Sequence, residues 1–360
     1  MEILSQLSAL PCQYESLKAE KRPILLYGMG DGAEKIYSEL HKRGIEAQGV
    51  FASEGFVRGQ SFLGHRVMSL SEAEEKYKDF VCVLCFALEG EKAQILKPLR
   101  EKHMLYSPNV PVYGEGVCDK AFILENIEKI QKLYDCLADD LSRKILMSVL
   151  KYNITGEIGY LQLEEDTFSY PNGFFRHSKR HIDVGAYDGD SVLEYAAYNE
   201  AYADIAAFEP DKANFKKLKQ NTAELRNILC ENAAVADKDG ASGVMGKGNR
   251  GTFLGEGGSG SIRTVKLDTY CRQPNINADG VPVGSMKIDA EGMDRQAIAG
   301  AANLIYKNRP DILVAVYHRA GDIFEIPLLI RNCDYKYKLY LRKKEYVPAW
   351  DVFLLATRKD

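Results

Sequence analysis

The sequence predicts an α/β protein made of two parallel-sheet domains joined by a helical connector. Apolar strand-like runs alternate with helical patterns twice along the 360 residues, and each alternation begins with a glycine-rich turn after a strand. Alternating strands and helices indicate parallel sheets, because parallel neighbours need crossover connections. A single core rarely grows beyond about 250–300 residues, so the length also favours two domains.

The first alternation predicts a Rossmann-like domain over residues 1–115. Ile24–Tyr27 is an apolar run, and Gly28 and Gly30 follow it directly. Helical patterns and strand-like runs then alternate at residues 48–51, 72–77, 81–86 and 91–102. The segment 107–116 contains two prolines and two glycines, which is typical of a domain boundary.

A helical connector is predicted over residues 116–150. Apolar residues recur there at steps of three and four, as on one face of a helix: Ile123, Ile127, Ile130, Tyr134, Leu137 and Leu141. A second helix is expected from about Asp139 to Lys151. Its apolar face is open to packing within the chain or against a second copy in a homodimer, and packing within the chain is the preferred interpretation.

The second alternation predicts a domain over residues 151–360. Its strand-like runs lie at residues 181–184, 203–208, 227–230, 283–288 and 312–317. Nine glycines fall within residues 240–261, which excludes a packed helix and favours a flexible hairpin or loop.

Composition excludes several classes of partner. The chain has 47 basic and 51 acidic residues and a net charge of −4, so neither a nucleic acid nor an anionic membrane surface is expected. The longest uncharged apolar run, residues 81–88, is far shorter than the ~20 residues of a membrane span. The N-terminus lacks the pattern of a signal peptide, which predicts a cytoplasmic protein with reduced thiols. Cys82 and Cys85 lie in a predicted buried strand, without a second pair to complete a zinc site.

The first glycine turn leaves its ligand open. Gly28, Gly30 and Ala33 match the G-x-G-x-x-G/A spacing of dinucleotide sites. Such sites also need an acid about 20 residues further on, at the end of the second strand. Ser53 stands there, and Glu54 comes one step later. Nucleotide or nucleotide-sugar binding, NAD-linked chemistry and a domain without a ligand are the three alternatives.

The second glycine turn is more informative. An apolar strand leads into Asp183, Gly185 and Gly189, and Asp190 opens a helix. The next strand ends in Glu209, where a carboxylate holds the ribose in a Rossmann-like sheet. The glycine spacing departs from G-x-G-x-x-G, which disfavours NAD.

The motifs of the C-terminal half resemble a known family. Residues 183–191 and 208–210 resemble the cofactor site of class I S-adenosylmethionine-dependent methyltransferases. Residues 286–292, followed by 297–300, resemble the FkbM family in particular. Three later stretches resemble the end of the same domain: 316–318, 322–327 and 337–342. More loosely, the N-terminal half resembles the Rossmann-like domains of glycan-biosynthesis enzymes.

This resemblance implies a class I methyltransferase fold with S-adenosyl-L-methionine as cofactor. The implied cofactor-binding residues are Asp183, Gly185, Ala186, Tyr187, Asp188, Gly189, Asp190, Ser191, Glu209, Pro210, Asn232, Ala233 and Asp289. By position, the glycine turn would face the methionine part, Glu209 would hold the ribose, and Asn232 and Ala233 would flank the adenine.

Three residues are candidates for catalysis. Asp289 and Glu291 lie two apart at a strand end, so their side chains share one face if both are extended. His318 follows the next strand and should emerge at the same edge of the sheet, where its ordinary pKa near neutrality suits a general base. Asp289 is an alternative base or an orienting group. The spacing is not diagnostic of a metal, so no metal is expected.

The resemblance implies transfer of a methyl group to an oxygen of a saccharide, a glycan precursor or a related natural product, as in polysaccharide biosynthesis. Two alternatives remain. One is a nucleotide-sugar oxidoreductase that uses the first glycine turn, and the other is a scaffold that binds the cofactor without transferring a group.

Overall fold

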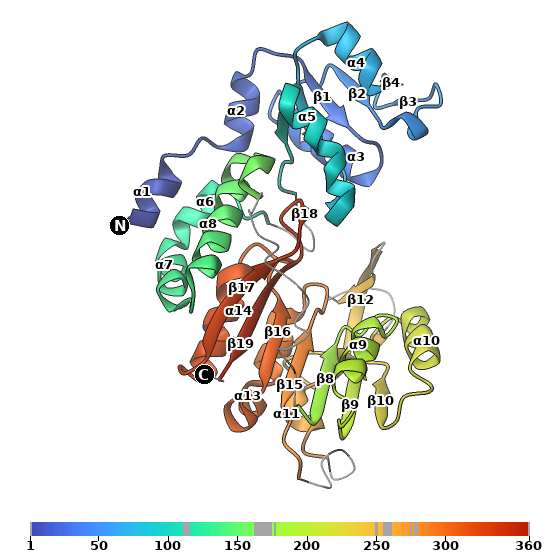
Figure 1. The fold of residues 1–360 in the computed structure, drawn as a ribbon, viewed down its shortest axis with the longest axis vertical. Helices are drawn as coiled ribbons and strands as arrows, with labels where there is room; N and C mark the ends of the chain where they lie inside the picture. Colours follow the sequence, from blue (N-terminus) through green and yellow to red (C-terminus); the bar gives the residue numbers. More distant parts are fainter. Residues whose placement is uncertain are drawn as a thin grey trace. The chain divides into compact units, whose positions relative to one another are not determined.

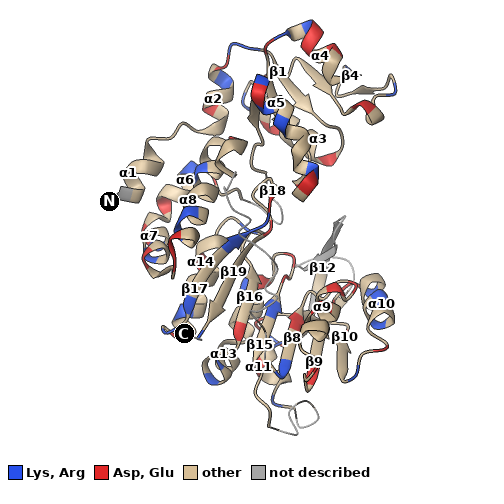
Figure 2. Ribbon diagram, in the orientation of Figure 1, with Lys and Arg blue, Asp and Glu red and all other residues tan. Residues whose placement is uncertain are grey.

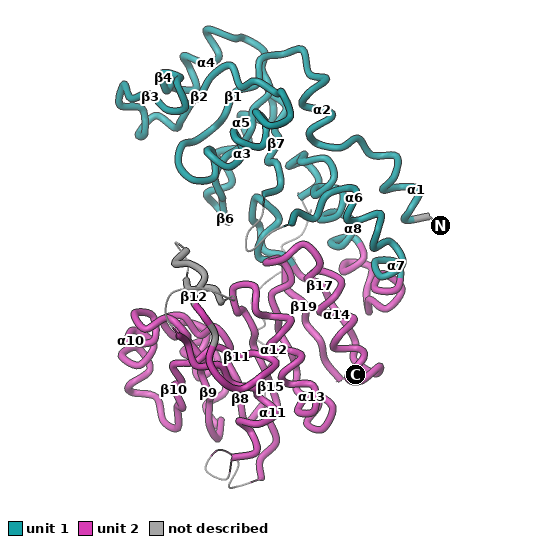
Figure 3. The backbone as a smooth tube through the Cα atoms, turned by 180° about the vertical axis from the view of Figure 1, so that it is seen from behind, with its two compact units in different colours: residues 1–131, 144–167, 343–351 teal, residues 132–143, 168–342, 352–360 magenta. Residues whose placement is uncertain are grey.

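The computed structural model describes residues 2–110, 116–161, 175, 178–248, 251–254, 261–273, 276 and 280–358. The chain forms two compact units that interleave along the sequence (Figure 3). Unit 1 contains residues 1–131, 144–167 and 343–351, and unit 2 contains residues 132–143, 168–342 and 352–360. The expected boundaries run consecutively instead. They do not assign residues 132–143 to unit 2 or residues 343–351 to unit 1.

Unit 1 contains the first predicted sheet (Figure 1). Its order is β3-β4-β2-β1-β5-β7, and its pairs are parallel except for the β3–β4 hairpin. The bounds are β1 Ile24–Tyr27, β2 Gly49–Phe51, β3 Ser61–Phe62, β4 His65–Met68, β5 Val81–Leu84 and β7 Met104–Tyr106. Every residue of β1, β2 and β5 is buried, which explains their continuous apolar runs. A short pair, β6 Leu88–Glu89 with β18 Tyr346–Val347, also belongs to this unit.

The helices of unit 1 follow local signals in the sequence. They are α1 Glu2–Ser8, α2 Gln13–Ala19, α3 Asp31–Lys42, α4 Leu70–Tyr77, α5 Lys97–Lys102 and α6 Lys120–Glu125. Ser69 and Glu72 form a reciprocal capping box at the start of α4. The single helix expected over residues 91–102 is instead a 3-10 helix, Gly90–Leu96, followed by α5. Pro98 lies in the first turn of α5, where its missing N–H is tolerated.

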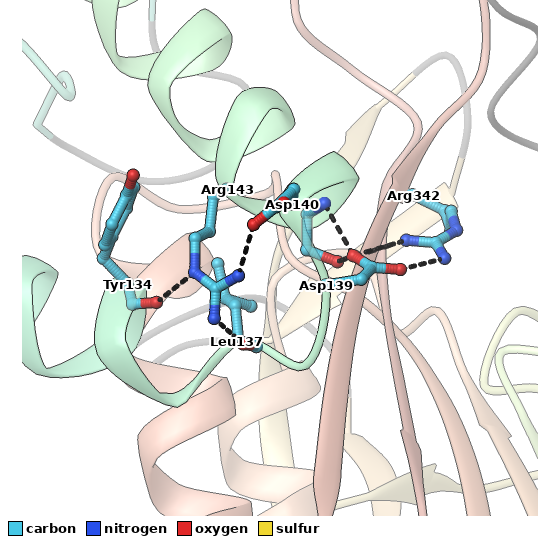
Figure 4. Close-up of polar contacts among 7 residues, drawn as sticks. Tyr134, Leu137, Asp139, Asp140, Arg143 and Arg342 are labelled. Atoms are coloured by element: carbon cyan, nitrogen blue, oxygen red, sulfur yellow. Dashed lines mark hydrogen bonds and ion pairs between the residues drawn. The ribbon is translucent and has the colours of Figure 1, made fainter.

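The connector continues in α7 Ile127–Cys136, α8 Asp140–Thr155 and the 3-10 helix Ile158–Leu161. The corner between α7 and α8 belongs to unit 2 and lies on β17, Lys338–Lys343. There the N–H of Ala138 donates to the carbonyl of Leu339 at 2.9 Å. Figure 4 shows Arg342 reaching Asp139, with Nη2 2.7 Å from Oδ2. The corner therefore covers part of an edge strand that would otherwise expose its backbone.

Unit 2 contains a seven-stranded sheet of order β10-β9-β8-β15-β16-β19-β17 (Figure 1). Besides β17, its strands are β8 Arg180–Val184, β9 Asp204–Phe208, β10 Ile228–Glu231, β15 Ser285–Ile288, β16 Asp311–Ala315 and β19 Val352–Thr357. Strands β10 through β16 are parallel, and β19 runs antiparallel to β16. The strand order reverses between β8 and β15. Open α/β sheets bind ligands at such a switch point, outside the carboxyl ends of the strands.

Helices lie on both faces of this sheet (Figures 1 and 3). They are α9 Asp190–Tyr198, α10 Lys212–Asn221, α11 Leu267–Tyr270, α12 Asp294–Gly300, α13 Ala302–Asn308 and α14 Asp322–Cys333. A smaller sheet contains β11 Ala234–Val235, β14 Ser261–Val265, β12 Gly240–Gly248 and β13 Gly251–Leu254. The antiparallel pairing of β12 with β13 gives the hairpin expected in the glycine-rich stretch. The rest of that stretch lies outside the described residues.

No helix among the described residues is both long and apolar enough to span a membrane. Lys and Arg are mixed with Asp and Glu over both units (Figure 2). This distribution agrees with the near-neutral composition.

Candidate active site

The turn after β8 brings the ends of three strands together. Gly185 has φ +75°, and a Cβ atom built there would lie 1.8 Å from the carbonyl oxygen of Asp289 at the end of β15. The N–H groups of Gly185 and Ala186 donate to the carbonyl of Phe208 at the end of β9, both at 3.0 Å. Glycine is therefore required at position 185, because a side chain would separate β8 from β15.

The buried side chains of Asp183 and Ser191 support this turn from inside the protein. Asp183 is fully buried. It accepts a hydrogen bond from Ser191 Oγ at 2.6 Å and lies 3.2 Å from Lys287 Nζ. Lys287 also donates to the carbonyl of Gly185 at 2.7 Å. Burial disfavours the charge of Lys287, but Asp183 and Asp289 outweigh burial and raise its pKa. Asp183 and Ser191 thus shape the turn from inside the protein rather than facing its open side.

Glu209 lies between the turn and the end of β9. Its Oε2 accepts the N–H of Tyr187 at 2.9 Å, and its Oε1 accepts the N–H of Asp211 at 2.8 Å. The residue is 6% exposed, and burial raises the pKa of its carboxyl group to about 7. Asn232 donates to the carbonyls of Glu209 and Pro210 at 2.9 and 3.1 Å. The ends of β9 and β10 are therefore joined beside the turn.

The remaining predicted cofactor residues surround this turn. Tyr187 is 45% exposed and has φ +48°. Gly189, with φ +95°, precedes the first residue of α9, and the Asp190 carboxylate accepts the N–H of Ser191 at 2.7 Å. The carbonyl of Asp188 accepts a hydrogen bond from Asn221 of α10, and Ala233 is fully buried. The predicted set thus lies at the carboxyl ends of β8, β9 and β10.

His318 lies in a cluster of carboxylates beyond β15 and β16. Its Nδ1 is 2.7 Å from Oδ2 of Asp294, and its Nε2 is 3.4 Å from Oδ1 of Asp289 and 4.0 Å from Oε2 of Glu291. The side chain of His318 is 1% exposed, whereas those of Asp289 and Glu291 are 28% and 30% exposed. The structure thus brings the three predicted catalytic residues together, with His318 behind the two carboxylates.

The charges of this cluster are strongly coupled. Burial alone would lower the pKa of His318, but Asp294, Asp289 and Glu291 outweigh burial and raise it to about 9. Burial also opposes ionisation of Asp294, but His318 outweighs burial and lowers the pKa of that carboxyl group. Burial raises the pKa of Glu291 to about 7. At neutral pH, His318 is therefore an imidazolium ion among carboxylates.

Asp294 was not predicted from the sequence. It is fully buried and begins α12, two residues after Gly292. Its Oδ1 accepts the N–H of Ala290 at 2.7 Å, and its Oδ2 accepts the N–H of Gly292 at 3.2 Å. An acid at the start of a helix is usually explained by the helix dipole, so the sequence alone does not single it out.

Three residues of the cluster have the ligand types of a metal site. The ligand atoms of Asp289, Asp294 and His318 lie within 4.8 Å of one another. Both oxygens of Asp294 already accept hydrogen bonds, one from Ala290 and the other from Gly292. A cation bound by Asp294 would share its oxygens with these backbone N–H groups and with His318.

A side chain of unit 1 packs beside the first glycine of the first glycine turn, Gly28. A Cβ atom on Gly28 would lie 2.5 Å from the ring of Phe86, so that ring fills the space beside the glycine. Ser53 stands where a dinucleotide site needs an acid, and its hydroxyl is 2.8 Å from that of Tyr27. Packing against Phe86 therefore accounts for Gly28, whereas a Cβ atom on Gly30 would have no heavy atom within 4 Å.

The parallel sheet, its antiparallel β19, the glycine turn after β8 and the acid after β9 define a class I methyltransferase fold, as the sequence predicted. Residues 183–337 match the family model described as the methyltransferase FkbM domain. Residues 183–337 are therefore similar to the FkbM methyltransferase domain, as the motifs had indicated.

A solved structure of similar length shares this fold. The methyltransferase FkbM from Methylobacillus flagellatus is similar over 99% of this chain and 97% of its own, with 18% identity and a TM-score of 0.72. Aeropyrum pernix fibrillarin with natively bound S-adenosyl-L-methionine matches 51% of this chain and 68% of its own, at 10% identity and a TM-score of 0.32. A putative methyltransferase from Streptococcus mutans in complex with SAH matches 54% and 99%, at 10% identity and a TM-score of 0.34. Curated protein sequences give no match.

Proposed function

We propose that this chain transfers a methyl group from S-adenosylmethionine to a hydroxyl oxygen of a saccharide, as in polysaccharide biosynthesis. The proposal rests on two features that meet at one edge of the sheet, namely the glycine turn after β8 and the cluster around His318. Gly185 touches the backbone of Asp289, and the Asp289 side chain belongs to the cluster around His318. A cofactor on the glycine turn would therefore lie beside a group of proton acceptors.

The residues at the turn fit this cofactor. The half-exposed Tyr187 lies on the open side of the turn, whereas Gly189 is packed against Leu218 and Thr222. Glu209 holds two backbone N–H groups there and is the acid suited to two ribose hydroxyls. In this proposal, residues 185–190 would hold the methionine part, Glu209 and Pro210 the ribose, and Asn232 and Ala233 the edge of the adenine. Asp183 and Ser191 would support the turn from beneath.

The bound cofactor supplies an electrophilic methyl group, and the protein supplies alignment and a sink for a proton. A hydroxyl oxygen becomes a good nucleophile only when a base is within hydrogen-bond reach. The carboxylates of Asp289 and Glu291, which lie beside the protonated His318, would provide that base. The carboxylates that surround His318 also favour a cationic sulfonium nearby and disfavour an anionic acceptor at the same place.

The saccharide acceptor is supported by the chemistry of the cluster. Carboxylate oxygens are hydrogen-bond acceptors, and a saccharide presents several hydroxyl donors. We also infer a cytoplasmic location, because all eight cysteines are free, as expected in a reducing compartment.

Calorimetric titration of the full chain with S-adenosylmethionine, S-adenosylhomocysteine and NAD tests the cofactor assignment. We expect the first two ligands to bind and NAD to give no heat of binding. Binding of NAD alone would favour an oxidoreductase, despite the ring of Phe86 beside Gly28. Binding of S-adenosylmethionine without turnover of neutral glycosides, uronates or lipid-linked sugars would favour a scaffold.

A further inference from the structure

We propose that Glu291 is the residue that accepts the proton of the acceptor hydroxyl, and that His318 and Asp294 are positioning residues behind it. This inference rests on the proposed methyl transfer, and it assigns separate roles within the cluster. It also differs from the sequence-based expectation that His318 itself is the base.

The burial of the cluster is the first argument. His318 has Asp294 on its Nδ1 side, and its Nε2 is covered by the side chains of Asp289 and Glu291. Only 1% of the His318 side chain is exposed, against 30% for Glu291. An acceptor that enters from solvent therefore meets a carboxylate before it meets the imidazole.

The second argument is the protonation state of His318. Its ring faces Asp289, Asp294 and Glu291, and Asp322 lies beyond Asp294 with its carboxylate on the N–H of Arg319. The carboxylates keep His318 protonated at neutral pH, and an imidazolium has no lone pair to accept a further proton. Its positive charge instead holds the negative charges of Asp289 and Asp294 in place.

Asp289 and Glu291 differ in their surroundings. Asp289 is closer to His318, at 3.4 Å, and it also acts on the buried Lys287. Its carboxylate therefore has two neighbouring cations, His318 and Lys287. Glu291 lies 4.0 Å from His318, and its burial raises its pKa to about 7. That pKa matches the range in which enzymes use a glutamate as a general base.

The backbone around Glu291 is held in an uncommon conformation. Glu291 has φ +49° and Gly292 has φ +89°. Asp294 accepts the N–H groups of Ala290 and Gly292, the two neighbours of Glu291. Arg319 Nε donates to the carbonyl of Gly292 at 2.6 Å. Such strained residues persist where the surroundings over-determine them and cluster at active sites. One carboxylate therefore fixes the loop of Glu291 and the ring of His318 together.

Proton transfer to Glu291 accompanies methyl transfer to the hydroxyl oxygen. The hydroxyl O–H bond breaks, and its proton passes to a carboxylate oxygen of Glu291. The new O–CH3 bond forms as the S–CH3 bond breaks, so the sulfonium becomes a neutral thioether. The neutral Glu291 acid then returns its proton to solvent through its exposed side.

The test compares Glu291→Gln with Glu200→Gln, the same change at an exposed position of unit 2. We expect Glu291→Gln to lower kcat by about 10²–10⁴-fold with the Kd for S-adenosylmethionine within threefold of wild type. Glu291→Asp should keep part of the rate and the shape of the pH profile. Thermal melting of each variant separates a fold defect from a catalytic one. Wild-type kcat in Glu291→Gln would overturn the assignment while leaving methyl transfer intact.

A second readout needs no acceptor. NMR of the chain with 13C-labelled glutamate carboxyl groups identifies the Glu291 signal by its absence in Glu291→Gln. We expect this signal to titrate near pH 7 in the free protein. Titration near the ordinary glutamate pKa of about 4.3 would overturn the assignment whether or not an acceptor has been found. If Glu291 titrates near pH 7 but no acceptor is methylated, the result would count against the proposed function instead.

Discussion

The Nδ1 atom of His318 lies 2.7 Å from Oδ2 of Asp294, and both side chains are almost wholly buried. This pair joins the loop after β15 to the loop after β16, and it is the centre of the cluster beside the glycine turn after β8. Several measurable consequences follow from its burial.

Asp294→Asn should destabilise the protein. The change leaves a buried imidazolium without its nearest counter-charge, which typically costs about 3–5 kcal/mol for a buried pair. Urea unfolding of the variant beside wild type measures the loss. Asp140→Asn is the matched control, because the Asp140 side chain is 90% exposed and pairs only at the surface with Arg143. Equal stability of Asp294→Asn and wild type would contradict the role given to this pair.

The stability of the fold should fall as the pH rises above neutrality. The pKa of His318 is about 9 in the folded chain, against about 6.5 when unfolded, so its contribution is complete below pH 6.5 and is lost as the pH rises through 9. The loss is about 3 kcal/mol at most. Urea unfolding from pH 6 to 10 should show this fall in wild type and a weaker one in His318→Gln. Parallel curves for the two proteins would contradict the assignment of the high pKa.

Glu209→Gln should weaken cofactor binding without unfolding the chain. Replacing a carboxylate that accepts hydrogen bonds costs about 1.5–3 kcal/mol per bond, which corresponds to an increase in Kd of about 10–100-fold. Calorimetry with S-adenosylmethionine measures the change, and Glu224→Gln, at an exposed position, is the control. An unchanged Kd would remove Glu209 from the ribose site.

Gly185→Ala should destroy the cofactor turn. The added Cβ would meet the Asp289 carbonyl at 1.8 Å, and φ +75° is strained for alanine. We expect a drop in melting temperature together with loss of S-adenosylmethionine binding. Gly159→Ala introduces the same methyl group where no heavy atom lies within 4 Å, and it should behave as wild type. Normal cofactor binding by Gly185→Ala would show that the cofactor binds elsewhere in the protein.

Chelation should leave the methyl-transfer rate unchanged. The two oxygens of Asp294 already accept backbone N–H groups, and the neighbouring His318 is itself cationic, so we expect no resident cation in the cluster. Dialysis against EDTA, followed by an assay for S-adenosylhomocysteine, tests this. Loss of rate that Mg²⁺ or Mn²⁺ restores would instead make Asp289 and His318 metal ligands.

Sequence reasoning predicted the elements whose signals are local. The buried strands β1, β5 and β16 contain short apolar runs, and the carboxyl ends of parallel strands meet at one edge. The sequence alone therefore predicted that one edge of the sheet holds Glu209, Asp289 and His318. The FkbM motifs placed the function in the same half of the chain.

The remaining features depend on contacts between distant residues. The burial of His318 and its raised pKa arise from carboxylates on another strand end, so the residue type alone suggested an ordinary base. Asp294 looked like a helix-terminal acid because its partners, Ala290 and Gly292, are backbone groups. The ring of Phe86 occupies the space beside Gly28, although the glycine spacing itself was typical of a dinucleotide site.

The most direct test of the central claim is transfer of an isotopically labelled methyl group. The full chain is incubated with S-adenosylmethionine carrying a 13C-methyl group and with neutral glycosides as acceptors, and the products are examined by NMR. The account predicts a 13C-labelled methyl ether on a sugar oxygen, formed in equal amount with S-adenosylhomocysteine. Labelled methyl on nitrogen, on carbon or on no acceptor, with the cofactor bound, would contradict it.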